Sequence, residues 1–132
     1  MTELLLDTNI ISYILKKHPL GELYRTVIHG NELCISFMTV AEIVEGACRI
    51  RQSSRKYQEI LNCIRPYKVI HSNPRICDCW GEIRAVRYRQ PISVADAWVA
   101  ATALAYDLPL VTHNAKDFAG IGDLKIITKY QA

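Results

Sequence analysis

Short apolar runs alternate along this chain with longer stretches in which apolar residues recur at helical spacing. Residues 39–51 illustrate the helical pattern, because Val40, Ile43 and Ala47 share one face. We expect strands at residues 3–6, 33–36, 67–70, 109–112 and 124–128. We expect helices at residues 9–17, 20–29, 39–51, 54–65, 74–88 and 93–106, and mostly loop at 114–122. Strands separated by helices form a parallel sheet that is covered on both faces, so the pattern predicts an α/β fold.

The length and hydropathy of the chain fit one ordinary domain. The chain has 132 residues, of which 50% are apolar, and residues 1–132 can therefore bury one core of ordinary size. Polar residues interrupt every apolar run before it reaches the length of a membrane span. The N-terminal residues lack the basic start and long apolar stretch of a signal peptide, so we expect a cytoplasmic protein without a membrane segment.

Basic residues are unevenly distributed. Residues 49–89 contain ten of the 16 Lys and Arg residues and only three acids, which leaves +7 there and about −4 in the rest of the chain. This distribution would suit a phosphate-binding face beside an acidic pocket, although solvated helix faces would give the same totals. The ten residues are Arg49, Arg51, Arg55, Lys56, Arg65, Lys68, Arg75, Arg84, Arg87 and Arg89.

Carboxylates recur where the predicted strands end and the next helices begin. Asp7 follows the first strand, Glu42 lies four residues into the segment that starts at Thr39, and Asp96 opens an alanine-rich helix. In parallel sheets, ligands bind beyond the carboxyl ends of the strands. A fourth acid, Asp117, follows the late strand at 109–112. The sequence therefore predicts that several carboxylates meet at one edge of the sheet.

Helix capping is the simpler explanation for each carboxylate alone. Asp7 can cap a helix, Thr39 with Glu42 has the spacing of a capping box, and Ser93 with Asp96 has the same shape. Capping does not explain why Asp96 stands on so apolar a helix, where an unpaired carboxylate is costly. Residues 112–117 could likewise be an ordinary polar loop with an Asx turn.

Several carboxylates at one edge require a cation, because their mutual repulsion would otherwise force some of them to be protonated. Oxygen ligands select hard ions such as Mg²⁺ or Mn²⁺, which also bind phosphates and activate water. We therefore expect phosphodiester hydrolysis.

Four motifs in register resemble those of the PIN-domain ribonucleases, and most closely the VapC-type toxins. They are LLLDTN at residues 4–9, TVAEIVEG at 39–46, Asp96 on its alanine-rich helix, and LVTHNAKDF at 110–118. The resemblance implies an α/β/α sandwich around a central parallel sheet. It also implies an endoribonuclease that depends on Mg²⁺ or Mn²⁺ and acts on RNA, commonly tRNA or rRNA.

The resemblance also assigns roles to residues. It implies an acidic catalytic set of Asp7, Glu42, Asp96 and Asp117, with Asp7 and Asp96 as the metal ligands. Asn114 competes with Asp117 for the last position, because some relatives place the acid nearer the strand end. Supporting or peripheral roles fall to Thr8, Asn9, Thr112 and Glu45.

Partners follow from the same resemblance. It implies a homodimer and a cognate antitoxin, for which apolar helices near residues 10–28 and 39–64 could form a groove. Two alternatives stay open: a PIN nuclease outside a toxin–antitoxin system, and a catalytically inactive PIN-like binding module. A receiver-type phosphoryl-transfer domain fits less well, because Thr8 and Asn9 supply no second acid beside Asp7, and residues 112–114 supply no Lys at the end of the late strand.

Overall fold

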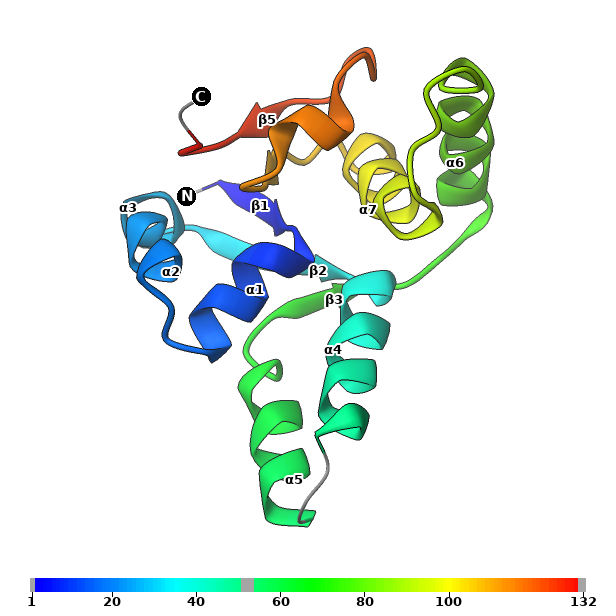
Figure 1. Ribbon diagram of the computed structural model, residues 1–132. Coiled ribbons are helices and arrows are strands. Elements are labelled where there is room, and N and C mark those ends of the chain that lie inside the picture. The colour runs from blue at the N-terminus through cyan, green and yellow to red at the C-terminus, as the bar shows by residue number, and fades with distance from the viewer. Residues whose placement is uncertain (1, 51–53, 131–132) are drawn as a thin grey trace.

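A five-stranded parallel sheet forms the centre of the computed structural model, which describes residues 2–50 and 54–130 (Figure 1). The strand order is β3-β2-β1-β4-β5, and all four pairings are parallel. The strands are β1 (Glu3–Leu6), β2 (Glu32–Ser36), β3 (Lys68–Ile70), β4 (Leu110–Val111) and β5 (Ile126–Ile127). The predicted α/β class with a central parallel sheet is confirmed.

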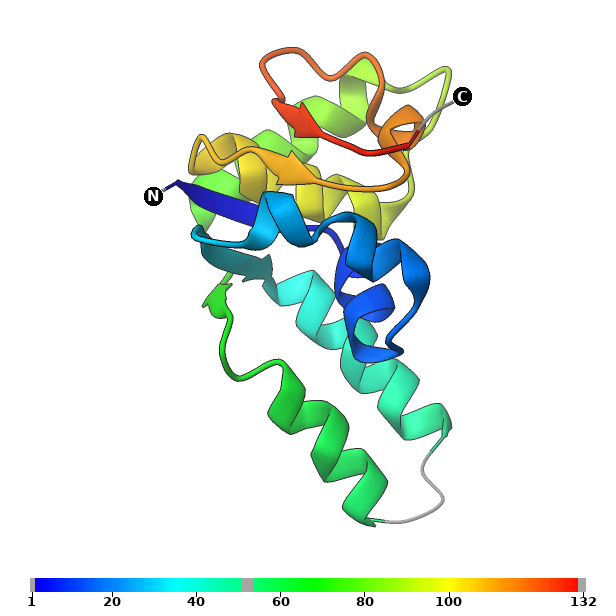
Figure 2. The same cartoon turned by 90° about the vertical axis from the view of Figure 1, so that its left-hand side faces the viewer.

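Helices cover both faces of the sheet. One layer contains α1 (Thr8–Leu15), α2 (Pro19–Leu23), α3 (Arg25–Ile28), α4 (Phe37–Arg49) and α5 (Ser54–Cys63). The other contains α6 (Pro74–Val86) and α7 (Val94–Ala105), as the lower and upper parts of Figure 1 show. The view in Figure 2 shows α4 and α5 side by side, extending beyond the rest of the molecule. No helix in the described ranges is long and apolar enough to cross a membrane.

The alternation of side chains along the strands divides the core in two. Leu5 packs with the small side chains of α7, whereas Leu4 and Leu6 pack on the opposite face with Ile10 and Ile35. All three leucines are almost wholly buried, so β1 is covered on both sides. Burying such a side chain contributes roughly 1.5–3 kcal/mol. The central position of β1 explains why its apolar run is continuous rather than alternating.

One local prediction is wrong, and a second segment has more structure than expected. The helix expected at 20–29 is two short helices that are separated at Tyr24, whose side chain is wholly buried. The hydroxyl of Tyr24 reaches polar groups beyond β4 and β5, and this tertiary contact accounts for the break. The expected loop at 114–122 contains a 3₁₀ helix, η1 (Ala115–Phe118), which is anchored by the buried ring of Phe118.

Gly21 and Gly46 offer a matched test of helix packing. A Cβ atom on Gly21 would lie 3.1 Å from backbone atoms of Tyr13, whereas a Cβ on Gly46 would meet nothing within 4 Å. We expect Gly21→Ala to lower the free energy of unfolding, because the backbone of α1 cannot move aside without disturbing the core. Gly46→Ala should raise it by about 0.5–1 kcal/mol through helix propensity. Urea denaturation measures both, and equal effects of the two substitutions would contradict the packing described here.

Candidate active site

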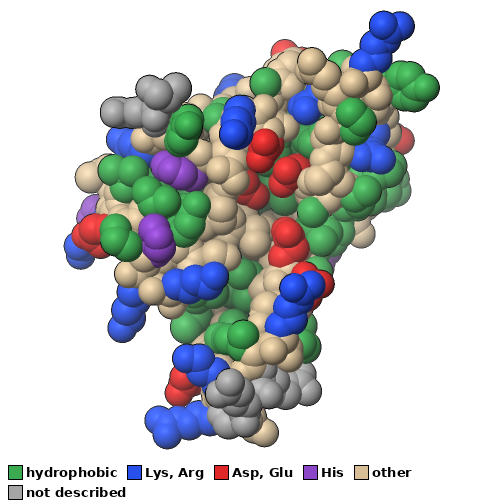
Figure 3. Space-filling model, viewed as in Figure 1, with side chains coloured by type: hydrophobic (Ala, Val, Ile, Leu, Met, Phe, Trp, Pro, Cys, Tyr) green, Lys and Arg blue, Asp and Glu red, His purple; other side chains and the backbone are tan. Residues whose placement is uncertain are grey.

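The carboxyl ends of β1, β2 and β4 meet the N-terminal ends of α1, α4 and α7 on one face of the molecule. Figure 3 shows acidic side chains gathered near the middle of this face, with Lys and Arg side chains around them. Each of the four acids predicted from the sequence belongs to a segment that begins at this edge, namely Asp7, Glu42, Asp96 and Asp117. The topology therefore brings the four segments to one place.

Asp7 is the most buried of the four acids, with only 5% of its surface exposed. It is the N-cap of α1, and its Oδ1 accepts a hydrogen bond of 2.8 Å from the backbone N–H of Thr8. Its Oδ2 accepts a 2.7 Å bond from the hydroxyl of Thr112. The capping explanation is thus correct for Asp7, but the cap uses one oxygen and leaves the other facing β4.

Thr112 fixes the geometry around Asp7. Its hydroxyl donates to Asp7 and accepts from Nδ2 of Asn9 at 3.3 Å and from the backbone N–H of Asn114 at 3.1 Å. One donor and two acceptor positions are all that a hydroxyl has, so every one is used. The supporting roles expected for Asn9 and Thr112 correspond to contacts in the structure.

Glu42 approaches the site through Thr8. The Thr8 hydroxyl donates to Oε1 of Glu42 at 2.7 Å, and the Thr39 hydroxyl lies 2.9 Å from it. Because the single hydrogen of Thr8 goes to Glu42, Thr39 must be the donor in the second bond. This chain of hydroxyls links α1 to α4 and leaves Oε2 of Glu42 without a partner among the described residues.

The capping box expected at Thr39 and Glu42 is wrong. The N-cap of α4 is Ser36, whose hydroxyl accepts from the backbone N–H of Met38 at 3.0 Å. Thr39 lies within the helix and is fully buried. The sequence did contain a signal for this, because Thr39 precedes Ile43 and Ala47 at intervals of four on the buried face.

Asp96 lies in the first turn of α7, where Ser93 is the N-cap and accepts from its backbone N–H at 3.1 Å. The N-cap expected at Ser93 is therefore present. Burial raises the pKa of the Asp96 carboxyl, the Ser93 hydroxyl partly offsets this, and the nearby charge of Asp117 raises it further. Asp96 and Asp117 are therefore electrostatic neighbours, as a shared site requires.

Asp117 is placed by a residue whose role the sequence did not indicate. Nη1 of Arg87 donates to the backbone carbonyls of Asp117 at 3.2 Å and Ala119 at 3.0 Å, and so holds η1 against the end of α6. The side chain of Asn114, the competing candidate, is exposed at the start of this turn. The charge of Asp117 acts on Asp96, whereas the Asn114 side chain carries no charge.

Burial raises the pKa of Asp7 to about 6. The hydrogen bonds from Thr112 and Thr8 oppose this shift, and the charges of Asp96 and Glu42 add to it. The acids thus interact through space, yet the described residues include no three His, Cys, Asp or Glu side chains close enough to hold a metal ion by themselves. The site is an electrostatically coupled group of oxygen donors rather than a closed cage.

Several of the basic residues at 49–89 are engaged within the protein. Arg49, Arg55 and Lys68 form ion pairs with Glu45, Glu59 and Glu3. The guanidinium groups of Arg84 and Arg87 donate to backbone carbonyls. Arg51 lies outside the described residues. The pairing of Arg49 with Glu45 also agrees with the prediction that Glu45 is peripheral to the site.

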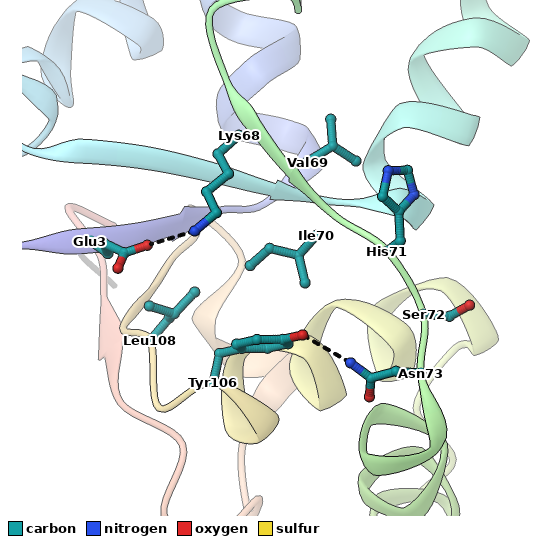
Figure 4. Close-up of a pocket in the computed structure, with 9 residues that line it drawn as sticks. All are labelled: Glu3, Lys68, Val69, Ile70, His71, Ser72, Asn73, Tyr106 and Leu108. Atoms are coloured by element: carbon teal, nitrogen blue, oxygen red, sulfur yellow. Dashed lines mark hydrogen bonds and ion pairs between the residues drawn. The ribbon is translucent and has the colours of Figure 1, made fainter.

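A separate hollow of about 500 Å³ lies along β3, and Figure 4 shows its lining. Four of its polar side chains form two pairs: Lys68 with Glu3 at 3.7 Å, and Nδ2 of Asn73 with the hydroxyl of Tyr106 at 2.8 Å. None of the four predicted acids lines it. The hollow is therefore distinct from the acidic site.

Comparisons with known proteins agree with this architecture. The family model described as PIN domain matches residues 4–124. The chain is 33% identical to Ribonuclease VapC1 of Haemophilus influenzae, over 92% of this chain and 93% of that protein. It is 28% identical to the tRNA(fMet)-specific endonuclease VapC of Shigella flexneri, over 95% and 96% of the two chains.

Solved structures give the same result. VapBC-1 from nontypeable Haemophilus influenzae contains a chain that matches with a TM-score of 0.81 and 31% identity, covering 96% of this chain and 98% of that one. DNA-bound VapBC from Salmonella typhimurium matches with a TM-score of 0.81 and 26% identity, covering 97% and 98%. Sequence, sheet topology and structural similarity together place this chain in the PIN domain family.

Proposed function

We propose that this chain is the toxin of a VapBC-type toxin–antitoxin pair, a metal-dependent endoribonuclease that acts in the cytoplasm and is inhibited by its antitoxin. Its residues 1–132 form one nuclease domain in this proposal, and its substrate is RNA, with tRNA and rRNA as the first candidates. The observation that carries the proposal is the burial of Asp7 at the end of the central strand, within the electrostatic reach of Asp96 and Glu42.

The donor chemistry of the site fits a hard divalent cation. Its acidic side chains offer only oxygen atoms, the preferred ligands of Mg²⁺ and Mn²⁺. Asp7 and Asp96 would hold the ion, and Glu42 and Asp117 would complete its surroundings. When bound, such an ion offsets the repulsion among the carboxylates, binds a phosphate oxygen and lowers the pKa of water.

The protein's own groups supply orientation and a base. Thr112 and the backbone of Thr8 fix both oxygens of Asp7, so this carboxylate cannot rotate. Thr8 holds one oxygen of Glu42 and leaves Oε2 able to accept a proton from the attacking water. Asp117 is the other candidate base, and Arg87 keeps its loop in place.

The proposal extends to protein partners. The antitoxin would occupy a groove of about 540 Å³ beside α1 and α2, whose apolar lining includes Tyr13, Ile14, Ile28 and Tyr67. Most of its lining comes from segment 10–28, one of the two segments from which the groove was expected, and none comes from 39–64. The toxin would also form a homodimer, which light scattering of the purified protein can establish.

Asp7→Asn and Asp96→Asn should each reduce cleavage of purified tRNA or rRNA by at least about 100-fold in the presence of Mg²⁺ or Mn²⁺. Each substitution removes a charged oxygen ligand while keeping the size of the side chain. Gel analysis of the RNA fragments measures the effect, and EDTA should abolish cleavage by the unmodified protein. Asp78→Asn is the control, because Asp78 is exposed on α6. This variant should cleave RNA like the unmodified protein. Full activity of Asp7→Asn or Asp96→Asn would refute the metal assignment.

Without metal, Asp7→Asn should stabilise the protein at neutral pH. The pKa of Asp7 is about 6 in the folded state and about 3.9 in an unfolded chain. Between these two pH values the folded state binds the Asp7 proton more tightly than the unfolded state does. The free energy of unfolding of the unmodified protein therefore falls as pH rises from about 4 through 6. Two pKa units correspond to about 3 kcal/mol, which is the cost of the Asp7 charge that the variant removes above pH 6. The amide NH2 of the variant must face the hydroxyl of Thr112 or the backbone N–H of Thr8, so we expect a gain smaller than this above pH 6 and a small loss of stability at pH 4.

Chemical denaturation in EDTA, run from pH 4 to 8 on the two proteins, measures this difference. Adding Mg²⁺ should then stabilise the unmodified protein and leave Asp7→Asn unchanged. If Asp7→Asn shows the same dependence of stability on pH as the unmodified protein, then ionisation of Asp7 does not destabilise the fold.

Asp117→Asn should weaken binding of Mn²⁺ more than Asn114→Ala does, because Asp117 is the residue whose charge acts on Asp96. Titration calorimetry with each variant measures the two affinities. A larger loss in Asn114→Ala would transfer the fourth position to Asn114.

A further inference from the structure

Aromatic side chains gather one helical turn away from the acidic site. Tyr13 follows Asn9 by four residues on α1, about one turn along the helix. His113 follows Thr112 directly, and its ring lies edge-on to Tyr13 and Tyr130, with centroids 6.0 and 5.5 Å apart. The ring of His18 lies 5.1 Å from that of Tyr13. We call Tyr13, His18, His113 and Tyr130 the aromatic shelf.

The aromatic shelf is joined to the acidic site by hydrogen bonds. The backbone N–H of His113 donates to Oδ1 of Asn9 at 3.4 Å, while Nδ2 of Asn9 donates to Thr112, the partner of Asp7. A nucleotide beside the acidic site would therefore place its neighbour over the shelf. Figure 3 shows histidine side chains among hydrophobic side chains on the same face as the acidic group.

Tyr24 supports the aromatic shelf from beneath. Its hydroxyl accepts from the backbone N–H of Lys129 at 3.0 Å and lies 2.6 Å from Nδ1 of His113. Its single hydrogen can go to Nδ1 or to the backbone carbonyl of Thr112 at 3.4 Å, so either tautomer of the His113 ring can form the 2.6 Å bond. The bond at Nδ1 orients the ring, and its Nε2 has no hydrogen-bond partner among the residues described.

The aromatic shelf is open to solvent and surrounded by free cations. Tyr130 exposes 51% of its surface, His18 is exposed, and Tyr13 and His113 are partly so. Four exposed lysines come from the same segments and form no ion pair within the described ranges; they are Lys16, Lys17, Lys116 and Lys129. This contrasts with Arg49, Arg55 and Lys68, which form ion pairs.

We propose that the aromatic shelf stacks an unpaired base of the RNA beside the phosphodiester that is cleaved, while the surrounding lysines hold the RNA backbone. The inference rests on the proposed ribonuclease function and narrows its substrate to RNA with at least one unstacked base next to the cut. Aromatic and histidine rings stack on the bases of single-stranded RNA in this way. The π face of a base is accessible to a protein side chain only when the base is not stacked inside a helix. Lysines supply the sequence-independent attraction to phosphate.

Binding of a fluorescent RNA tests the shelf directly. The probe is a single-stranded oligoribonucleotide with 2-aminopurine moved one position at a time, mixed with Asp96→Asn protein so that the RNA survives. We expect quenching at one position. Tyr130→Ala in the same background should abolish the quenching and weaken binding about five-fold or more. Tyr130→Phe should restore both, because it keeps the ring.

Tyr88→Ala is the matched control, since Tyr88 is 82% exposed and lies beyond the end of α6, outside the shelf. It should bind like the parent protein. The same probe annealed to its complement should bind more weakly and should not respond to Tyr130→Ala. Thermal melting checks that each variant is folded, and His113→Ala gives a second, independent loss of the shelf.

Cleavage by the otherwise unmodified protein separates this inference from the proposed function. With tRNA as substrate, Tyr130→Ala should raise KM about five-fold or more and change kcat much less. If the protein cleaves RNA and both shelf variants bind and cleave like the parent, the shelf is wrong and the ribonuclease assignment stands. If the parent cleaves no RNA, the proposed function fails, and the fluorescence result still decides whether the shelf stacks a base.

Discussion

Pairing of β1 with β4 is the constraint on which the site depends. It places Thr112 beside Asp7, and the backbone N–H of Asp7 itself bonds to the carbonyl of Val111 at 2.9 Å. A carboxylate buried at the centre of a sheet is tolerable because donors from two different elements reach its two oxygens. The remaining contacts of Thr112 then extend this order to Asn9 and Asn114.

The two layers of the sandwich each contribute part of the site. Glu42 comes from the layer of α1 and α4 and is tied to Thr8, whereas Asp96 and Asp117 come from the layer of α7 and η1. Asp7 lies between them at the end of the central strand and responds to charge from both sides. The acidic group therefore lies between the two core clusters, one on each face of the sheet. The distances between its carboxylates depend on how the helices of both layers pack on the sheet.

The sequence predicted the sheet, its helical layers and the four acidic segments because each depends on local periodicity and on the rule that strand ends meet at one edge. It did not predict the break at Tyr24, the buried hydroxyl of Thr39 or the hydrogen bonds from Arg87 to the backbone of the Asp117 loop. Each of these depends on a partner far away in the chain. The charge total of segment 49–89 likewise does not tell which of its side chains have partners, and Arg49, Arg55 and Lys68 do.

The burial of Asp7 has an evolutionary consequence. In the proposed function, the carboxylate that cleavage requires is also one whose buried charge is expected to lower the stability of the metal-free fold, so selection for stability and selection for activity would oppose each other at a single position. Exchange of one oxygen for an amide nitrogen would yield a sturdier, inert copy. Where toxin activity is selected against, a single substitution at this position would remove the activity. The resulting protein would keep its fold and the rest of its surface.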